Sequence, residues 1–340
     1  MRSQRFGIEM EMTGISRKKA AEVIAAYFDT HEVYDGGSYD AYHVTDGQGR
    51  RWKVVSDASI HPAARDGRSA STLYKVEVVS PICHYEDIET IQELVRKLRH
   101  AGACVNRSCG IHIHVDAAPH SVKTLRNLVN IMVSKEDLLY KALAVDVARE
   151  DHYCQKTDLR FLEELNRKKP KSIEIFEEMW YHGDSRSYDH YDETRYHALN
   201  LHSVFSKGTI EFRLFNGTMH AGKVKTYIQL SLAISHQALV QKGASHSRTK
   251  STNEKYTFRT WLLRLGMIGE EFQTARKFLL ENLEGNIAWK DPVQAERQKE
   301  RLAAKRMEEA AQGLQETEEA PEQESETETQ QDEGFTMQMF

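Results

Sequence analysis

The sequence predicts an α+β domain built on one β-sheet. Three segments that lie far apart in the chain, residues 6–12, 109–116 and 209–215, alternate apolar with ionisable residues. Successive side chains of a strand point to opposite faces, so this alternation is typical of strands with one buried face. Between and after these segments, apolar residues recur at helical spacing. The chain is therefore expected to combine a sheet with packed helices.

The first segment places Ile8 and Met10 on one face of a strand and Glu9 and Glu11 on the other. Side chains two residues apart on a strand are separated by roughly 6.5–7 Å. That distance is too long for the two carboxylates to chelate one ion, but it suits two adjacent ions.

The second and third segments follow the same rule. His112, His114 and Asp116 share one face of the second strand, and Glu211 and Arg213 share one face of the third. If the three strands belong to one sheet, carboxylates, imidazoles and a guanidinium gather on its polar face. This is the set of groups needed to hold divalent metal and phosphate.

Helices and turns are expected between the strands. The helical pattern covers residues 16–28, 86–100, 122–133, 135–149 and 223–240, with two more helices within 258–283. Ser16 is expected to cap the first helix, and Ser134 with Asp137 to restart a helix after residue 133. Residues 33–60 read as two or three strands with glycine turns. The tyrosine-rich residues 151–194 read as irregular, either a lid over a site or a packed surface excursion.

Charge divides the chain. Eleven of the 51 acidic residues and none of the 46 basic ones lie in residues 308–340, which leaves the first 307 residues with a net charge of +6. This mildly positive charge suits an anionic ligand such as ATP, but it is too small to indicate a nucleic-acid-binding surface. We expect a catalytic domain over residues 1–290, a charged helix over 291–315 and a disordered acidic tail over 316–340.

The sequence also predicts a cytoplasmic protein. It begins without the apolar core of a signal peptide and has no apolar run of membrane-spanning length. Its four cysteines lack C-x-x-C spacing and read as free thiols. No nucleic-acid or membrane partner is expected, and oligomeric state is not predicted.

The motifs resemble those of a known superfamily. An E-x-E strand at residues 9–11, a G-x-H-x-H strand at 110–114 and an E-x-R strand at 211–213 occur in the order found in the glutamine synthetase superfamily. This superfamily includes glutamate–cysteine ligases, guanidino kinases and amidoligases. Three further segments look most like the amidoligase branch: WKVVSDASI at 52–60, VEVVSP at 76–81 and RYHALN at 195–200. The resemblance implies a curved antiparallel sheet with helices on its convex face, followed by C-terminal helices.

The resemblance also implies two metal ions. Glu9, His112 and Glu211 would share one ion, and Glu11 and Glu77 would hold the other. The ions would be Mg²⁺ or Mn²⁺, because magnesium prefers oxygen ligands and manganese also accepts imidazole.

The remaining candidates would contact the nucleotide or the substrate. His114 would face the ATP phosphates, and Arg213 the transferring phosphoryl or the acceptor carboxylate. Arg195 would be a second phosphate clamp, since arginine binds oxyanions in a bidentate manner. Asp57 would either complete the second metal site or contact substrate, and Lys53 could reach phosphate.

The function implied is an ATP- and metal-dependent carboxylate–amine ligase that forms an amide on an amino acid or peptide through an acyl phosphate. The chain has no glycine-rich phosphate loop, so ATP would bind through metal and arginine. Three alternatives stay open: a guanidino or small-molecule kinase of the same fold, a non-catalytic interaction protein that retains the fold, and a metallohydrolase.

Overall fold

The computed structural model describes the backbone of residues 1–318 and the side chains of residues 1–308, apart from 292 and 295. The chain divides into two compact units, Met1–Lys290 and Asp291–Phe340. The first unit contains one eight-stranded sheet. Its strands are β1 (Phe6–Met12), β2 (Glu32–Gly36), β3 (Ala41–Thr45), β4 (Arg51–Val55), β5 (Val76–Val79), β6 (Gly110–Asp116), β7 (Leu199–Asn200) and β8 (Thr209–Asn216).

Ten α-helices of the described residues belong to this first unit. They are α1 (Arg17–Phe28), α2 (Ile88–His100), α3 (Val122–Leu143), α4 (Val147–His152), α5 (Leu159–Lys168), α6 (Ile173–Tyr181), α7 (His202–Lys207), α8 (Ala221–Val240), α9 (Glu254–Arg264) and α10 (Gln273–Leu280).

The sheet is antiparallel throughout, with the strand order β2-β3-β4-β5-β1-β6-β8-β7. The expected α+β class and antiparallel sheet are therefore confirmed. The three segments that defined the sequence pattern are β1, β6 and β8, and they are consecutive neighbours in the sheet. Their polar faces consequently meet.

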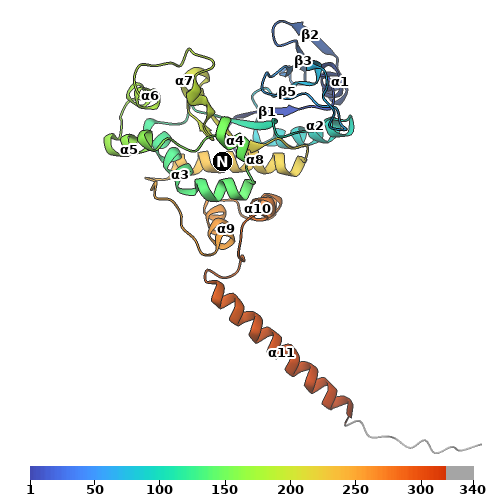
Figure 1. Ribbon diagram of the computed structural model, residues 1–340, viewed down its shortest axis with the longest axis vertical. Coiled ribbons are helices and arrows are strands. Elements are labelled where there is room, and N and C mark those ends of the chain that lie inside the picture. Colours follow the sequence, from blue (N-terminus) through green and yellow to red (C-terminus); the bar gives the residue numbers. More distant parts are fainter. Residues whose placement is uncertain (319–340) are drawn as a thin grey trace, which may run out of the picture. The chain divides into compact units, whose positions relative to one another are not determined.

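The apolar face of the sheet is covered by helices. Ile8, Met10 and Ile113 are at most 3% exposed and belong to one core with the apolar faces of α1, α2, α3 and α8. Figure 1 shows α2 and α8 running beside β1, while α9 and α10 lie beyond α3 and α8. Burial of the apolar face leaves the polar face free to build a site.

Helix limits follow local chemistry in most places. Ser16 caps α1 as predicted, since its side chain accepts a hydrogen bond from the Lys19 amide. The predicted break at Ser134 is wrong. Its hydroxyl donates to the Ile131 carbonyl within a continuous α3, and the capping serine is Ser121.

The prediction of an irregular segment over residues 151–194 is also wrong in part, because α5 and α6 lie within it. Phe161 of α5 packs edge-on against Phe176 and Trp180 of α6. This aromatic contact stabilises two short helices. Residues 183–192 remain without a helix or strand.

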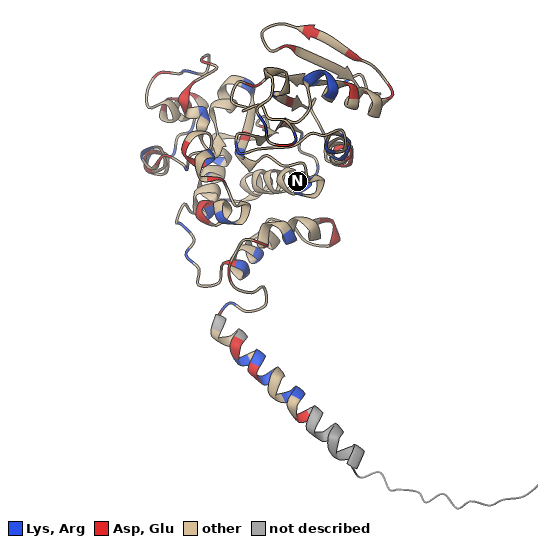
Figure 2. Ribbon diagram, turned by 45° about the vertical axis from the view of Figure 1, so that its right-hand side comes forward, with Lys and Arg blue, Asp and Glu red and all other residues tan. Residues whose placement is uncertain are grey.

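The second unit contains α11 (Pro292–Glu318), where the sequence predicted a charged helix over 291–315. Lysine, arginine and glutamate are interspersed along its described part (Figure 2). The predicted disordered tail falls, from residue 319 on, outside the described residues. None of the helices in residues 1–318 is both long and apolar enough to cross a membrane.

Candidate active site

Strand register brings the predicted ionisable residues together. Glu9 of β1 is paired with His112 of β6, and His114 of β6 is paired with Glu211 of β8. On the other side of β1, Glu11 is paired with Glu77 of β5 (register partners). Directly paired residues of an antiparallel sheet share a face. Four strands therefore contribute side chains to one polar cluster.

The first group of donor atoms surrounds His112. Its Nδ1 lies 3.2 Å from Glu9 Oε2 and 3.6 Å from Glu211 Oε1. One ligand atom from each residue falls within 4.8 Å of the others. Two carboxylates and an imidazole at this spacing can hold one divalent cation.

A second group shares the same histidine. His112 Nε2 lies 3.8 Å from Glu11 Oε1, and Glu11, Glu77 and His112 also offer ligand atoms within 4.8 Å of one another. A neutral imidazole has one unprotonated nitrogen, so the tautomer of His112 decides which group it serves. Glu11 is fixed by the Gly110 amide, which donates to its Oε2 at 2.6 Å.

The pKa shifts describe a strongly charged cluster. Burial would raise the pKa of Glu9, but His114 and His112 outweigh it and hold that pKa well below its usual value. Burial, followed by the charges of Glu9 and Glu11, raises the pKa of Glu77 well above its usual value. The side of the cluster around Glu77 is therefore short of positive charge. This is the condition that a bound cation relieves.

A β-bulge lies beside Arg213 on β8. Ile113 is paired with Phe212 but Ile111 is paired with Phe215, so two residues of β8 stand opposite His112. Arg213 is 5% exposed, and its Nη1 donates to Glu211 Oε1 at 2.5 Å.

Glu211 is anchored on both oxygens. Asn200 Nδ2 donates to its Oε2 at 2.6 Å, while Arg213 holds its Oε1. Burial would raise the pKa of Glu211, but Arg213 and the two histidines lower it to about 2. Its carboxylate is thus ionised and oriented before any ligand binds.

A cavity of about 130 Å³ opens on this cluster. Its walls include four residues of the cluster: Glu9, Glu11, Glu77 and His112. They also include Asp57 and Arg195, two predicted site residues that lie outside the three strands. Also on these walls are Arg149, Tyr153, Tyr191, Tyr196 and Arg213. Arg195 and Arg213 both lie over the ring of Tyr196, at 5.6 and 5.8 Å from its centroid. The small volume suits a carboxylate or an amino group rather than a large ring.

Two larger cavities, of about 300 Å³ each, adjoin the first. One lies beside Glu211 and is lined by Arg195, His190, His202 and Lys207. The other begins at Glu9 and extends toward apolar walls. All three cavities therefore border the same carboxylate cluster.

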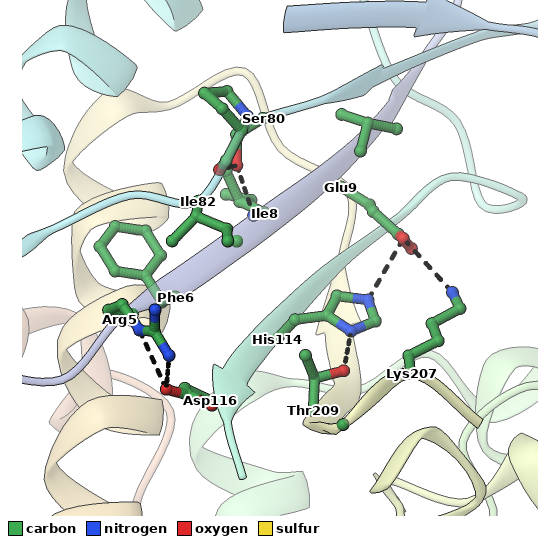
Figure 3. Close-up of a pocket in the computed structure, with 14 residues that line it drawn as sticks. Arg5, Phe6, Ile8, Glu9, Ser80, Ile82, His114, Asp116, Lys207 and Thr209 are labelled. Atoms are coloured by element: carbon green, nitrogen blue, oxygen red, sulfur yellow. Dashed lines mark hydrogen bonds and ion pairs between the residues drawn. The ribbon is translucent and has the colours of Figure 1, made fainter. Parts of the chain in front are cut away.

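Figure 3 shows the second of these larger cavities. Glu9, His114 and Lys207 point toward one another at one end, and Ile82 lies toward the other. His114 Nε2 is 3.2 Å from Glu9 Oε1, and its Nδ1 is 3.0 Å from Thr209 Oγ1. Burial would lower the pKa of His114, but Glu9 and Glu211 outweigh it and raise it. The two carboxylates therefore favour the positively charged form of His114.

Of the ten predicted site residues, nine line one of these three cavities. Lys53 does not. It lies on the polar face, paired through Val79 with Glu9, but it is two strands away and exposed. Asp57 is held by Ser59, whose amide donates to it at 2.6 Å.

Sequence reasoning missed four residues that support the site. Asn200 orients Glu211, Lys207 Nζ lies 3.9 Å from Glu9 Oε1, Thr209 contacts His114, and Arg149 lines the small cavity. Asn200 ends the RYHALN segment, and Thr209 opens the E-x-R strand, so both had a local signal. Arg149 and Lys207 lie on helices with no pattern that marks them.

The donor set fits a hard divalent cation. Carboxylate oxygens with one imidazole are ligands that Mg²⁺ tolerates and Mn²⁺ accepts readily. The four cysteines, all unpaired and within the described residues, are not part of either group.

Comparison with known proteins agrees with the sequence motifs. Residues 2–235 match the family described as "Putative amidoligase enzyme". No curated protein sequence matches the chain. Solved structures similar to this one include a bifunctional glutathione synthetase from Pasteurella multocida, with 12% identity and a TM-score of 0.35. The match covers 82% of this chain and 46% of that chain, so this chain spans less than half the length of that protein. The family match covers more than half of the chain, and the protein therefore belongs to the amidoligase family.

Proposed function

We propose that the protein is an ATP- and divalent-metal-dependent carboxylate–amine ligase that acts on an amino acid or a peptide. The observation that carries this proposal is the cluster itself: Glu9, Glu11, Glu77, His112 and Glu211 meet on one sheet face. Arginines line the adjoining cavity. Such a cluster with nearby arginines can supply what phosphoryl transfer uses, a bound divalent metal and cations beside the phosphate oxygens.

One ion would be held by Glu9, His112 and Glu211. The other would be held by Glu11 and Glu77. Asp57 would be a further oxygen ligand or would contact the substrate. Bound Mg²⁺ or Mn²⁺ would supply charge that offsets the phosphate oxygens and orients them. The raised pKa of Glu77 supports this assignment, because a crowded carboxylate is stabilised as an anion by a neighbouring cation.

ATP would lie in the cavity of Figure 3. Its apolar walls at Pro81 and Ile82 suit a nucleobase, while His114 and Lys207 at the other end suit the phosphates. Both side chains adjoin Glu9, which brings the phosphates next to the carboxylate cluster.

Arg213 and Arg195 would bind the transferring phosphoryl and the acceptor carboxylate. Both line the small cavity, and a planar guanidinium can make two parallel bonds to either anion. Arg213 would exchange part of its bond to Glu211 for the ligand, because the guanidinium has further N–H groups to offer.

The chemistry would proceed in two displacements. An oxygen of the acceptor carboxylate attacks the γ-phosphorus of ATP, the bond to the β-bridging oxygen breaks, and ADP leaves. The amine nitrogen then attacks the acyl carbon, the carbon–oxygen bond to phosphate breaks, and the amine gives up a proton. The products are an amide, ADP and inorganic phosphate.

We also infer that the sheet is the curved sheet of the glutamine synthetase superfamily, with the site on its concave face. Its support is that α1, α2, α3 and α8 share a core with one face of the sheet while the carboxylates occupy the other.

A screen of carboxylate and amine pairs for ADP formation tests the proposal. We expect ADP only when ATP, Mg²⁺, a carboxylate and an amine are all present, and we expect the Glu9→Gln variant to form none. A stable phosphorylated product without an amine would instead identify a kinase. ADP formation in the wild type with neither organic substrate would point to hydrolysis.

A further inference from the structure

Arg149 of α4 is a buried cation that has no counter-ion among the described residues. Its residue is 2% exposed, yet its side chain lines the small cavity. Among the residues that the structure describes, its Nη2 makes one hydrogen bond, of 3.3 Å, to the Arg213 carbonyl, and its Nε has no partner. No carboxylate in that part of the chain lies within 4 Å of its guanidinium nitrogens. Most of its five N–H groups are therefore free to bind a ligand.

Gly110 makes room for this guanidinium. A Cβ at position 110 would lie 2.7 Å from Arg149 Cζ and would overlap its terminal nitrogens. Glycine is therefore required here by close approach and not by backbone conformation. The same residue fixes Glu11 through its amide, so the position of Arg149 is coupled to the metal-binding side of the cavity.

The other two arginines of the cavity differ from Arg149. Arg213 is buried but is paired with Glu211. Arg195 donates to the His190 carbonyl at 2.7 Å and is only half-buried. Burying a charge without a partner is costly, and the cost is offset when an anion binds. The face of Tyr153, 5.9 Å from the Arg149 guanidinium, offers only a weak contact by comparison.

We propose that Arg149 binds a second carboxylate of the acceptor substrate, distinct from the carboxylate that is activated. The substrate class is therefore a dicarboxylate: a diacidic amino acid, or a peptide with a free carboxylate besides the reacting one. A carboxylate fits the small cavity and matches the two parallel N–H groups of a guanidinium. This assignment rests on the proposed ligase function for the identity of the reacting group.

Binding measurements test this assignment without turnover. Succinate, glutarate and adipate are compared with butyrate, valerate and hexanoate, each pair having equal carbon number. Calorimetry or ligand-detected NMR is run with Mg²⁺ and a nonhydrolysable ATP analogue. We expect at least one dicarboxylate to bind roughly tenfold or more tightly than its monocarboxylate, as for a hydrogen bond to a charged group.

Three variants identify the residue responsible. Arg149→Met should abolish the preference for the dicarboxylate and leave monocarboxylate binding within about threefold. Gly110→Ala should weaken the preference although Arg149 is retained, because the guanidinium is displaced. The matched control is Arg107→Met, which removes an exposed arginine paired with Asp146 at the start of the same helix. It should retain the preference.

Folding of each variant is checked by circular dichroism. If Arg149→Met does not fold, the same binding measurements are made with Arg149→Lys and Gly110→Ala instead. The assignment is overturned if the wild type does not distinguish the two series, or if the folded Arg149 and Gly110 variants keep the full preference. The ligase proposal has a separate readout. An Arg149-dependent preference in a protein that never forms ADP would sustain Arg149 as a carboxylate-binding residue and overturn the ligase.

Discussion

Replacing Glu211 by glutamine should cost the metal-free protein about 3 kcal/mol of folding free energy, because the buried Arg213 guanidinium loses its partner. A carboxyl whose pKa is about 2 instead of 4.5 is held in its ionised form by about 3 kcal/mol. Removing one member of a buried ion pair typically costs about 3–5 kcal/mol. Glutamine is almost isosteric and its carbonyl can still accept from Asn200, so the loss reflects charge and not a cavity.

Denaturant unfolding in EDTA at pH 7 measures this cost. The double variant with Arg213→Met removes both charges and should lose less than the sum of the two single variants. Glu22→Gln, which breaks only a surface pair with Lys19, is the control and should stay within about 0.5 kcal/mol. Added Mg²⁺ at 100 times its dissociation constant should stabilise the wild type by about 2.7 kcal/mol and the Glu211 variant far less. A Glu211→Gln protein that matches the wild type in EDTA and gains as much from Mg²⁺ would refute the reasoning.

Three further outcomes are expected. Arg213→Lys should slow ADP formation by roughly 10²-fold, because lysine lacks the planar guanidinium. Calorimetry should show little change in affinity for a nonhydrolysable ATP analogue. An unchanged rate would mean that Arg213 is only a structural charge partner. A chain that ends at Lys290 should keep its activity and have a melting temperature within about 2 °C of that of the full chain, because it retains the compact first unit. Failure to fold would show that this unit needs residues 291–340. Burial would raise the pKa of Asp46, but hydrogen bonds from Arg50 and Trp52 outweigh it and lower it. The stability that its carboxylate contributes should therefore be present above its usual pKa of 3.8 and be lost as the pH falls further. Denaturant unfolding of Asp46→Asn at pH 7 should show a loss of about 2 kcal/mol that shrinks at pH 3, and a pH-independent loss would contradict this.

Most predictions about the site came from strand parity, the rule that successive side chains of a strand point to opposite faces of the sheet. The alternation around Glu9 and Glu11 and around His112 determined which side chains share a face, and a period of two leaves no other choice. Parity does not determine which strands are neighbours. The grouping of Glu11 with Glu77 was expected from the family resemblance and not from parity, and the pairing of β5 with β1 brings the two side chains together.

Features that depend on tertiary packing could not be predicted from the sequence. The bulge beside Arg213 has no local signature in β8, because it depends on the register with β6. Ser134 looked like a cap, yet its hydroxyl bonds back to Ile131 because the buried faces of α3 favour a continuous helix. Arg149 reaches the site only through the placement of α4 against Gly110. An isolated arginine on a short helix gives no sign of such a role.

Transfer of ¹⁸O tests the ligase proposal most directly. With a carboxylate and amine pair that supports ADP formation, the acceptor carboxylate is labelled with ¹⁸O and the released inorganic phosphate is examined by mass spectrometry. Formation of an acyl phosphate followed by attack of the amine on the acyl carbon predicts one ¹⁸O atom in each phosphate released. Phosphate without the label, alongside an unmodified labelled carboxylate, would contradict carboxylate activation and with it the ligase.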